Sequence, residues 1–160
     1  MNIAVTGATG RMGKSVIEEI FQRSDSTTVS FATSQKTQKD LPNHLSSAEF
    51  PTCPPLDFSS QLQKSNPNVI IDLTVPEASL FFAANAAKFS IPIVIGTTGF
   101  TEEQLNELHT LSDEIPILFE ANFSRGIAAL HLAIDSISGI LSNYDIELTE
   151  THHNKKVDAP

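Results

Sequence analysis

The stretch IAVTGATGRMG, residues 3–13, decides the fold that the sequence predicts. Residues 3–6 form a short apolar run that ends directly on Gly7. A helical spacing follows at once, because apolar side chains recur on one face at Met12, Val16, Ile17, Ile20 and Phe21. A strand, a glycine turn and a helix in this order open a βαβ unit.

The rest of the chain continues this alternation. Residues 34–55 are polar and proline-punctuated, which predicts a loop with a short strand near Cys53. Thr101 and Gln104 form a capping-box pattern at the start of one helix. The other predicted elements are strands at 28–33, 69–73, 91–95, 115–119 and 144–150, and helices at 58–64, 76–88 and 124–141. Such alternation predicts an α/β fold, a doubly wound parallel sheet with helices on both faces.

Composition narrows the class of protein. The 160 residues are 40% apolar and 18% charged, so a packed core is expected. The 19 acidic and 10 basic residues leave a net charge of −9, which argues against nucleic-acid binding. No apolar run has the length of a membrane helix, and the N-terminus does not resemble a secretion signal. A single cysteine, Cys53, excludes an internal disulfide. We therefore expect a cytoplasmic protein that binds no metal and no membrane.

The first candidate site is the G-x-x-G-x-x-G pattern at Gly7, Gly10 and Gly13. Glycines between a strand and a helix permit a tight turn and a close approach of backbone N–H groups to a pyrophosphate. This placement predicts a Rossmann-type dinucleotide site. A glycine turn in an α/β protein without a ligand is the alternative.

The end of the second predicted strand indicates which dinucleotide binds. An acidic residue there favours NAD, whereas a basic one tolerates the 2′-phosphate of NADP. The sequence has no acid at this point, and Ser34 and Lys36 are candidate partners of a 2′-phosphate. Lys36 as a solvated loop lysine is the alternative, so NADH and NADPH both remain open.

Two further segments follow directly after predicted strands, where ligands of open α/β sheets bind. Gly96–Gly99 offers backbone amides and hydroxyls suited to a nicotinamide ribose, although the tetrapeptide is also a common turn. In Ala121–Ser124, Asn122 is a candidate for the nicotinamide carboxamide, and Ser124 is expected to be a helix N-cap.

The segment 150–160 holds the only locally basic cluster of this acidic chain. Histidine exchanges protons near neutral pH, and lysine donates to or neutralises a carboxylate. Adjacent histidines without further ligands make a poor metal site, so no metal is expected. A surface loop without a function is the alternative.

These segments together resemble the dihydrodipicolinate reductase (4-hydroxy-tetrahydrodipicolinate reductase) family of lysine and diaminopimelate biosynthesis. The resemblance rests on GATGRMG at 7–13, IDLTVPEAS at 71–79, VIGTTGF at 94–100, ANFSRG at 121–126 and ELTETHHNKKVDAP at 147–160. The last motif is highly specific. The resemblance implies a Rossmann-type domain at residues 1–123 and, at residues 124–160, the incomplete start of an α+β substrate and oligomerisation domain.

The resemblance also implies an activity. NADH or NADPH would reduce a small cyclic dicarboxylate, 4-hydroxy-tetrahydrodipicolinate, to tetrahydrodipicolinate. His152 matches the general acid/base of the family, Lys156 the proton donor and His153 a contact to a substrate carboxylate. The residues that match cofactor contacts are Gly7, Ala8, Thr9, Gly10, Arg11, Met12, Gly96, Thr97, Thr98, Glu120, Ala121, Asn122 and Phe123.

The sequence departs from the family at two places. Many members carry an acid where Ser34 stands, and members continue after the Asp-Ala-Pro motif with Ser-Gly-Thr, whereas this chain ends at Pro160. We therefore expect a truncated form with an intact dinucleotide site and impaired turnover, and a homotetramer for the complete chain. A non-catalytic nucleotide-binding module is the alternative. A short-chain dehydrogenase is excluded because Leu148 stands four residues after Tyr144, where that class requires lysine.

Overall fold

The structure, a computed structural model, describes residues 1–36, 43, 49–145, 147, 149 and 151. The chain divides into two compact units, Met1–Ala121 and Asn122–Pro160. The first unit holds the sheet and most of the predicted cofactor residues.

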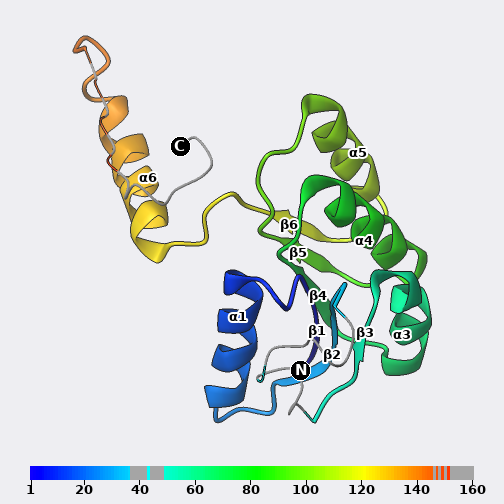
Figure 1. The fold of residues 1–160 in the computed structure, drawn as a ribbon. Helices are drawn as coiled ribbons and strands as arrows, with labels where there is room; N and C mark the ends of the chain where they lie inside the picture. Colours follow the sequence, from blue (N-terminus) through cyan, green and yellow to red (C-terminus); the bar gives the residue numbers. More distant parts are fainter. Residues whose placement is uncertain (37–42, 44–48, 146, 148, 150, 152–160) are drawn as a thin grey trace. The chain divides into compact units, whose positions relative to one another are not determined.

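The first unit is built on a six-stranded parallel sheet (Figure 1). Its strands follow the spatial order β3-β2-β1-β4-β5-β6, so the order reverses direction between β1 and β4. In an open α/β sheet this reversal point is where a nucleotide binds, beyond the carboxyl ends of the strands. The strands are β1 (Asn2–Thr6), β2 (Thr28–Thr33), β3 (Thr52–Cys53), β4 (Val69–Asp72), β5 (Ile93–Ile95) and β6 (Ile117–Phe119).

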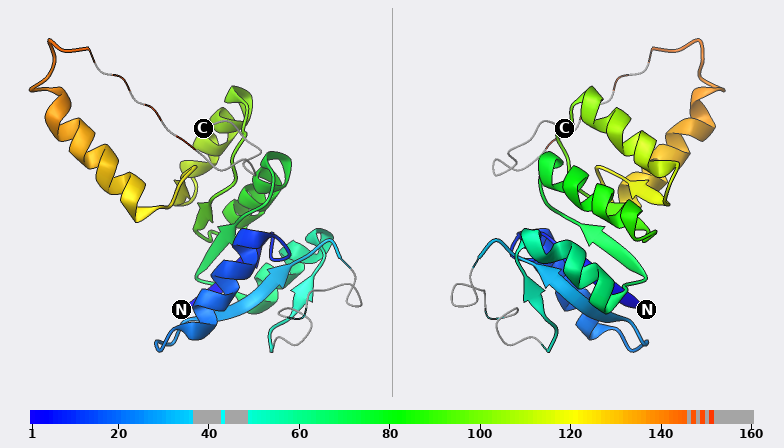
Figure 2. Two further views of the ribbon diagram at one scale, coloured as in Figure 1. Left: turned by 60° about the vertical axis from the view of Figure 1, so that its left-hand side comes forward. Right: turned by 90° about the vertical axis from the view of Figure 1, so that its right-hand side faces the viewer.

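Helices cover both faces of this sheet, as the alternation of elements predicts. Figure 1 shows α1 (Arg11–Gln22) on one face and α3 (Phe58–Ser65), α4 (Pro76–Lys88) and α5 (Glu102–Ser112) on the other, and the right-hand view of Figure 2 shows the latter helices from outside. A short 3-10 turn, Pro55–Asp57, precedes α3 and was not predicted from the sequence.

The two faces of the sheet bury separate apolar clusters. Successive side chains of β1 point to opposite faces, so Ile3 and Val5 pack with α1 while Ala4 packs on the other face. On that other face, Phe58 of α3 meets Phe82 of α4 edge to face, with ring centroids 4.7 Å apart. This packing fixes both helices, and with them the loops at the carboxyl ends of the strands.

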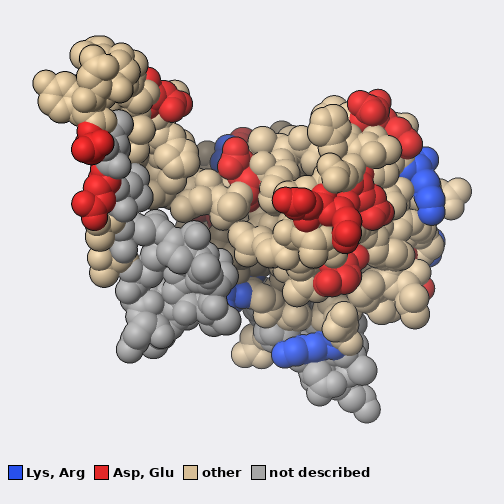
Figure 3. Space-filling view, turned by 90° about the horizontal axis from the view of Figure 1, so that it is seen from above, with Lys and Arg blue, Asp and Glu red and all other residues tan. Residues whose placement is uncertain are grey.

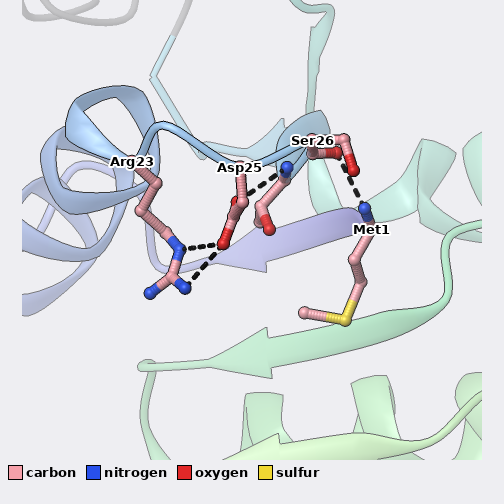
Figure 4. A network of polar contacts seen from close by, with 5 residues as sticks. Met1, Arg23, Asp25 and Ser26 are labelled. Atoms are coloured by element: carbon pink, nitrogen blue, oxygen red, sulfur yellow. Dashed lines mark hydrogen bonds and ion pairs between the residues drawn. The ribbon is translucent and has the colours of Figure 1, made fainter.

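A polar network holds the turn between α1 and β2 (Figure 4). The Arg23 guanidinium donates twice to Asp25 Oδ2, at 2.9 and 2.6 Å, and Asp25 Oδ1 accepts from the Thr27 amide at 3.0 Å. The amino group of Met1 donates to the Ser26 carbonyl at 2.8 Å. The hydrogen bonds from Arg23 and Thr27 hold the pKa of the Asp25 carboxyl well below its usual range.

Most predicted elements are confirmed. The strand 28–33 and the helix 76–88 have the predicted bounds, and the short strand near Cys53 is present as β3. The capping box is formed in both directions, because the Gln104 amide donates to Thr101 Oγ1 at 3.3 Å and the Thr101 amide donates to Gln104 Oε1 at 2.9 Å.

One prediction in the second unit is wrong. Residues 144, 145, 147 and 149, the described part of the predicted strand 144–150, belong to no strand. A strand is stable only when its backbone bonds to a neighbouring strand, and no described strand pairs with this segment. The prediction for Ser124 is confirmed, because Ser124 is the N-cap of α6 (Arg125–Ser138), although its side chain makes no capping bond. The Ser124 amide donates to Asn122 Oδ1 at 2.8 Å, which forms a local turn directly before the helix.

Candidate dinucleotide site

The loop from Gly7 to Gly10, called the glycine loop below, packs tightly against the end of β4. Gly7 has a φ of 72°, and a Cβ there would lie 2.2 Å from the Leu73 carbonyl oxygen. A Cβ at Gly13 would lie 2.3 Å from the Gly7 carbonyl oxygen. The Gly10 amide closes the turn by donating to the same Gly7 carbonyl at 3.0 Å. Only glycine fits at positions 7 and 13, which is the close approach that a phosphate-binding turn requires.

Helix α1 begins at this loop without a competing anion. Its N-cap is Gly10, which has no side chain to cap the first turn, and that turn contains no acidic residue. The start of a helix carries partial positive charge and N–H groups without intrahelical partners. Arg11 and Met12 are exposed in this first turn. The end of the helix is therefore suited to a phosphate group.

A pocket of about 340 Å³ lies at the carboxyl ends of the strands. It joins the glycine loop to the end of β2 and to the loop between β4 and α4. Of the predicted cofactor residues it brings together Gly7, Thr9, Gly10 and Ser34. Its other lining residues are Thr33, Gln35, Pro55, Leu73, Thr74, Val75, Ala78 and Phe82, none of which was predicted. A larger hollow of about 610 Å³ lies against α1 and contains no residue of the glycine loop.

Ser34 and Lys36 differ in what they offer to a ligand. Ser34 is buried, and its Oγ accepts a hydrogen bond from the Lys36 amide at 2.9 Å. Lys36 is exposed and is not a lining residue of the pocket. Among the described residues, no salt bridge engages the Lys36 ammonium. The loop therefore presents a cation next to the pocket and buries the neighbouring hydroxyl.

The loop after β5 places its two threonines differently. Thr98 is exposed, whereas Thr97 is only 3% exposed. The Thr97 hydroxyl donates to Asp72 Oδ2 at 2.9 Å and accepts from the Thr74 amide at 3.0 Å. This hydroxyl therefore donates and accepts its hydrogen bonds inside the protein. Ligand contacts from this loop would come from backbone groups and from Thr98.

Asp72, buried beside the pocket loops, is a further residue that sequence reasoning missed. It ends β4, is fully buried, and accepts hydrogen bonds from the hydroxyls of Thr6, Thr74, Ser79 and Thr97. A signal was available, because one acid interrupts the apolar run Val69–Leu73. An acid within a buried strand requires several donors around it.

The remaining predicted residues lie near or beyond the unit boundary. Glu120 and Ala121 end the first unit, whereas Asn122 and Phe123 begin the second. His152, His153 and Lys156 lie outside the described residues. Ala8 is the exception, because it is buried within the glycine loop of the first unit. Within the described ranges no group of three or more His, Cys, Asp or Glu side chains is placed to hold a metal.

Among the described residues, exposed acidic side chains outnumber exposed basic ones, in line with the 19 acidic and 10 basic residues of the sequence. On the face of Met1–Ala121 drawn in Figure 3, acidic side chains gather in patches and basic ones are scattered. Helix α5 contributes Glu102 and Glu103 in its first turn. In the part of the chain that is described, no helix combines the length and the apolar character needed to cross a membrane.

Comparison with known proteins decides the family. The model of the dihydrodipicolinate reductase N-terminus matches residues 1–123. The chain belongs to the dihydrodipicolinate reductase family. The 4-hydroxy-tetrahydrodipicolinate reductases of Haloarcula marismortui and Natronomonas pharaonis are each 40% identical to it, over 99% and 100% of the chain.

A solved structure of the family has the same fold. The dipicolinate-bound dihydrodipicolinate reductase from Paenisporosarcina sp. TG-14 matches all of this chain with a TM-score of 0.75 and 27% identity. The predicted family and the Rossmann-type fold are therefore confirmed. The chain spans 59% and 60% of the two curated relatives and 61% of the solved chain.

Proposed function

We propose that the protein is an NAD(P)H-dependent reductase that converts 4-hydroxy-tetrahydrodipicolinate to tetrahydrodipicolinate. The observation that supports this most directly is the glycine loop at the point where the strand order of the sheet reverses. There Gly7 and Gly13 admit no Cβ and the pocket opens beside them. The relatives from Haloarcula marismortui and Natronomonas pharaonis carry this activity in their names.

The first unit fits a nicotinamide dinucleotide. Backbone groups of Gly7–Met12 would hold the pyrophosphate, because they surround a helix start that lacks an acidic residue. Gly96, Thr98 and the segment Glu120–Phe123 would contact the nicotinamide half, and Thr97 would support that loop from inside. When bound, the reduced nicotinamide supplies the hydride for the reaction.

The acid/base residues of the proposal come from the family motif. His152 would act as general acid/base, Lys156 would donate the proton and His153 would contact a substrate carboxylate. The product lacks the 4-hydroxyl group of the substrate, so this group leaves as water. Hydride addition to the unsaturated ring leaves electron density that a neighbouring cation stabilises and protonates. The dipicolinate bound by the solved relative is a cyclic dicarboxylate, which supports a substrate of that class. A homotetramer and a cytoplasmic location complete the proposal for the whole protein.

The proposed cofactor is NADH or NADPH. No acid follows β2, and an acid there would repel a 2′-phosphate. The exposed ammonium of Lys36 could pair with the 2′-phosphate of NADPH. The Ser34 hydroxyl is buried and accepts a hydrogen bond from the Lys36 amide. We propose that both cofactors bind and that Lys36 sets the preference.

Calorimetric titration with NADH and NADPH tests the cofactor site. Residues 1–160 should bind at least one of them saturably. Gly7→Ala should abolish binding, because its Cβ meets the Leu73 carbonyl at 2.2 Å. Gly139→Ala is the matched control, since a Cβ there meets no atom within 4 Å. Absence of binding by a folded wild-type chain would refute the proposal.

Substrate-dependent oxidation of NAD(P)H tests the reaction. A chain extended to the length of the relatives should turn over, whereas residues 1–160 should do so poorly. Alanine at both His152 and Lys156 should remove most of the turnover of the extended chain. Cofactor binding without turnover in the extended chain would instead favour the non-catalytic module. Full-rate reduction by residues 1–160 would contradict the expected impairment.

A further inference from the structure

Asp72 stands where the two halves of the sheet meet. It is the last residue of β4 and pairs with Thr6, the last residue of β1. The reversal of strand order lies between these two strands, which Figure 1 shows side by side in the middle of the sheet. The β1–β3 half of such a sheet binds one mononucleotide and the β4–β6 half binds the other. Asp72 thus sits at the junction of both halves.

Within the described residues, the side-chain donors to the Asp72 carboxylate are all hydroxyl groups. Its Oδ1 accepts from Thr6 Oγ1 and, at 2.8 Å, from Thr74 Oγ1. Its Oδ2 accepts from Ser79 Oγ and, at 2.9 Å, from Thr97 Oγ1. A carboxylate has about four acceptor positions, and these donors use all of them. No salt bridge to Asp72 is formed among the described residues.

The hydroxyls come from three separate segments of the chain. Thr6 directly precedes the glycine loop, Thr74 lies in the loop after β4, and Thr97 lies in the loop after β5. Ser79, in the first turns of α4, also lies 2.8 Å from Thr97 Oγ1. Thr97 in turn accepts from the Thr74 amide at 3.0 Å. A single side chain therefore connects every loop that follows β1, β4 and β5.

Stability alone gives a poor account of an acid at this place. A buried carboxylate without a cation is costly, and an apolar side chain would complete the apolar run of β4 at less cost. What an apolar residue lacks is direction. Four hydrogen bonds at fixed angles hold three segments in one arrangement, whereas apolar contacts are non-directional.

We propose that Asp72 is a positioning residue for the dinucleotide. It aligns the glycine loop on one side of the junction with the loops after β4 and β5 on the other. This inference rests on the proposed function, since it assumes that a dinucleotide spans both halves. Asp72 itself touches no ligand and acts through the loops that its hydroxyl partners hold.

Dinucleotides and ADP differ in how much of the site they occupy. NADH and NADPH span both halves of the sheet, whereas ADP fills only the half next to the glycine loop. Loss of the Asp72 network should weaken dinucleotide binding and leave ADP binding nearly unchanged. A residue with a merely structural role would weaken both ligands in the same ratio or neither.

The test uses Asp72→Asn in residues 1–160, with circular dichroism to confirm folding. Asparagine keeps the shape but replaces one acceptor oxygen by an NH₂ donor, so two hydroxyls lose their acceptor. Titrations followed by NMR would give Kd for NADH, NADPH and ADP. We expect Kd of the better-bound dinucleotide to rise about tenfold or more, and that of ADP to change by less than about twofold.

Milder variants keep the test decisive if Asp72→Asn does not fold. Thr97→Val and Ser79→Ala each remove one hydroxyl donor and should shift the ratio of the two Kd values in the same direction. Ser59→Ala is the matched control. It removes a side-chain hydrogen bond to Asn85 Oδ1, 2.5 Å long and between α3 and α4, without touching the network. It should leave the ratio unchanged.

The outcomes distinguish the two proposals. A wild-type chain that binds neither dinucleotide overturns the proposed function and this inference with it. A wild-type chain that binds, with Asp72→Asn or the milder variants showing the wild-type ratio, overturns this inference alone. A ratio that changes equally in Ser59→Ala would also overturn it, because the effect would then follow from any lost polar contact.

Discussion

At Gly13 the fold leaves no space for a methyl group, so Gly13→Ala should destabilise the protein. Its Cβ would lie 2.3 Å from the Gly7 carbonyl oxygen, and relief requires the glycine loop to move. We expect a loss of about 1–3 kcal/mol in the free energy of unfolding, the usual cost of overpacking. Denaturant titration measures it.

Gly126→Ala is the control for this prediction. Gly126 also lies in the first turn of a helix, but a Cβ there would meet only Ser124 Oγ at an ordinary 3.6 Å. Alanine favours a helix over glycine, so this variant should keep or raise helix stability. Equal destabilisation by both substitutions would contradict the contact argued for Gly13.

Lys36 should affect one cofactor more than the other. Lys36 is exposed and stands two residues after Ser34, which lines the pocket. Lys36→Ala should weaken NADPH by about fivefold and leave NADH nearly unchanged, as expected for one exposed ion pair. Lys64→Ala, at the end of α3, is the control. Equal effects on both cofactors would show that Lys36 does not meet the 2′-phosphate.

Cys53 should make stability fall at high pH. Burial raises the pKa of its thiol to about 11, against an ordinary value of 9.0. Above pH 9.0 the unfolded chain loses this proton and the folded chain keeps it, so folding becomes less favourable as pH rises toward 11. The pH dependence of the melting temperature, compared with that of Cys53→Ala, isolates this contribution. Identical profiles above pH 9.0 would disprove it.

At the scale of single elements, the N-terminus of α5 offers a prediction. Thr101→Ala removes the hydroxyl that accepts from the Gln104 amide, one half of the capping box. It should lower the free energy of unfolding by about 1 kcal/mol. Thr110→Ala is the control, since its hydroxyl bonds only back to the Asn106 carbonyl within the same helix. Thermal melts of both variants measure the difference.

Elements with local causes were predictable from the sequence. The helix 76–88 begins where proline is tolerated, and α5 begins at a capping box that needs only neighbouring residues. The strand expected at 144–150 failed for the opposite reason. Alternating side chains indicate a strand, but only a partner strand provides the hydrogen bonds, and the described chain contains none for it.

At the scale of the whole molecule, the first unit should be self-sufficient. Both apolar clusters of the core lie within Met1–Ala121, and the family model matches residues 1–123. A fragment of residues 1–123 should unfold cooperatively and bind NAD(P)H as residues 1–160 do. Calorimetry checks both properties. Loss of affinity in a folded fragment would assign part of the cofactor site to residues 124–160.

The sequence by itself determined the family, the order of elements and the glycine loop. These depend on local features: the period of apolar side chains, the placement of glycine and proline, and motifs of a few neighbouring residues. It also pointed to Ser34 and Lys36, because the end of β2 follows from the strand pattern.

Only the tertiary structure decided what surrounds Asp72. Thr6 and Thr97 stand 66 and 25 residues away in the chain and meet Asp72 only because β1, β4 and β5 are neighbours in the sheet. The same packing buried the Thr97 hydroxyl, which the motif alone had offered to a ligand. Whether a polar group serves a ligand or the interior depends on contacts between distant segments, and these form only when the sheet assembles.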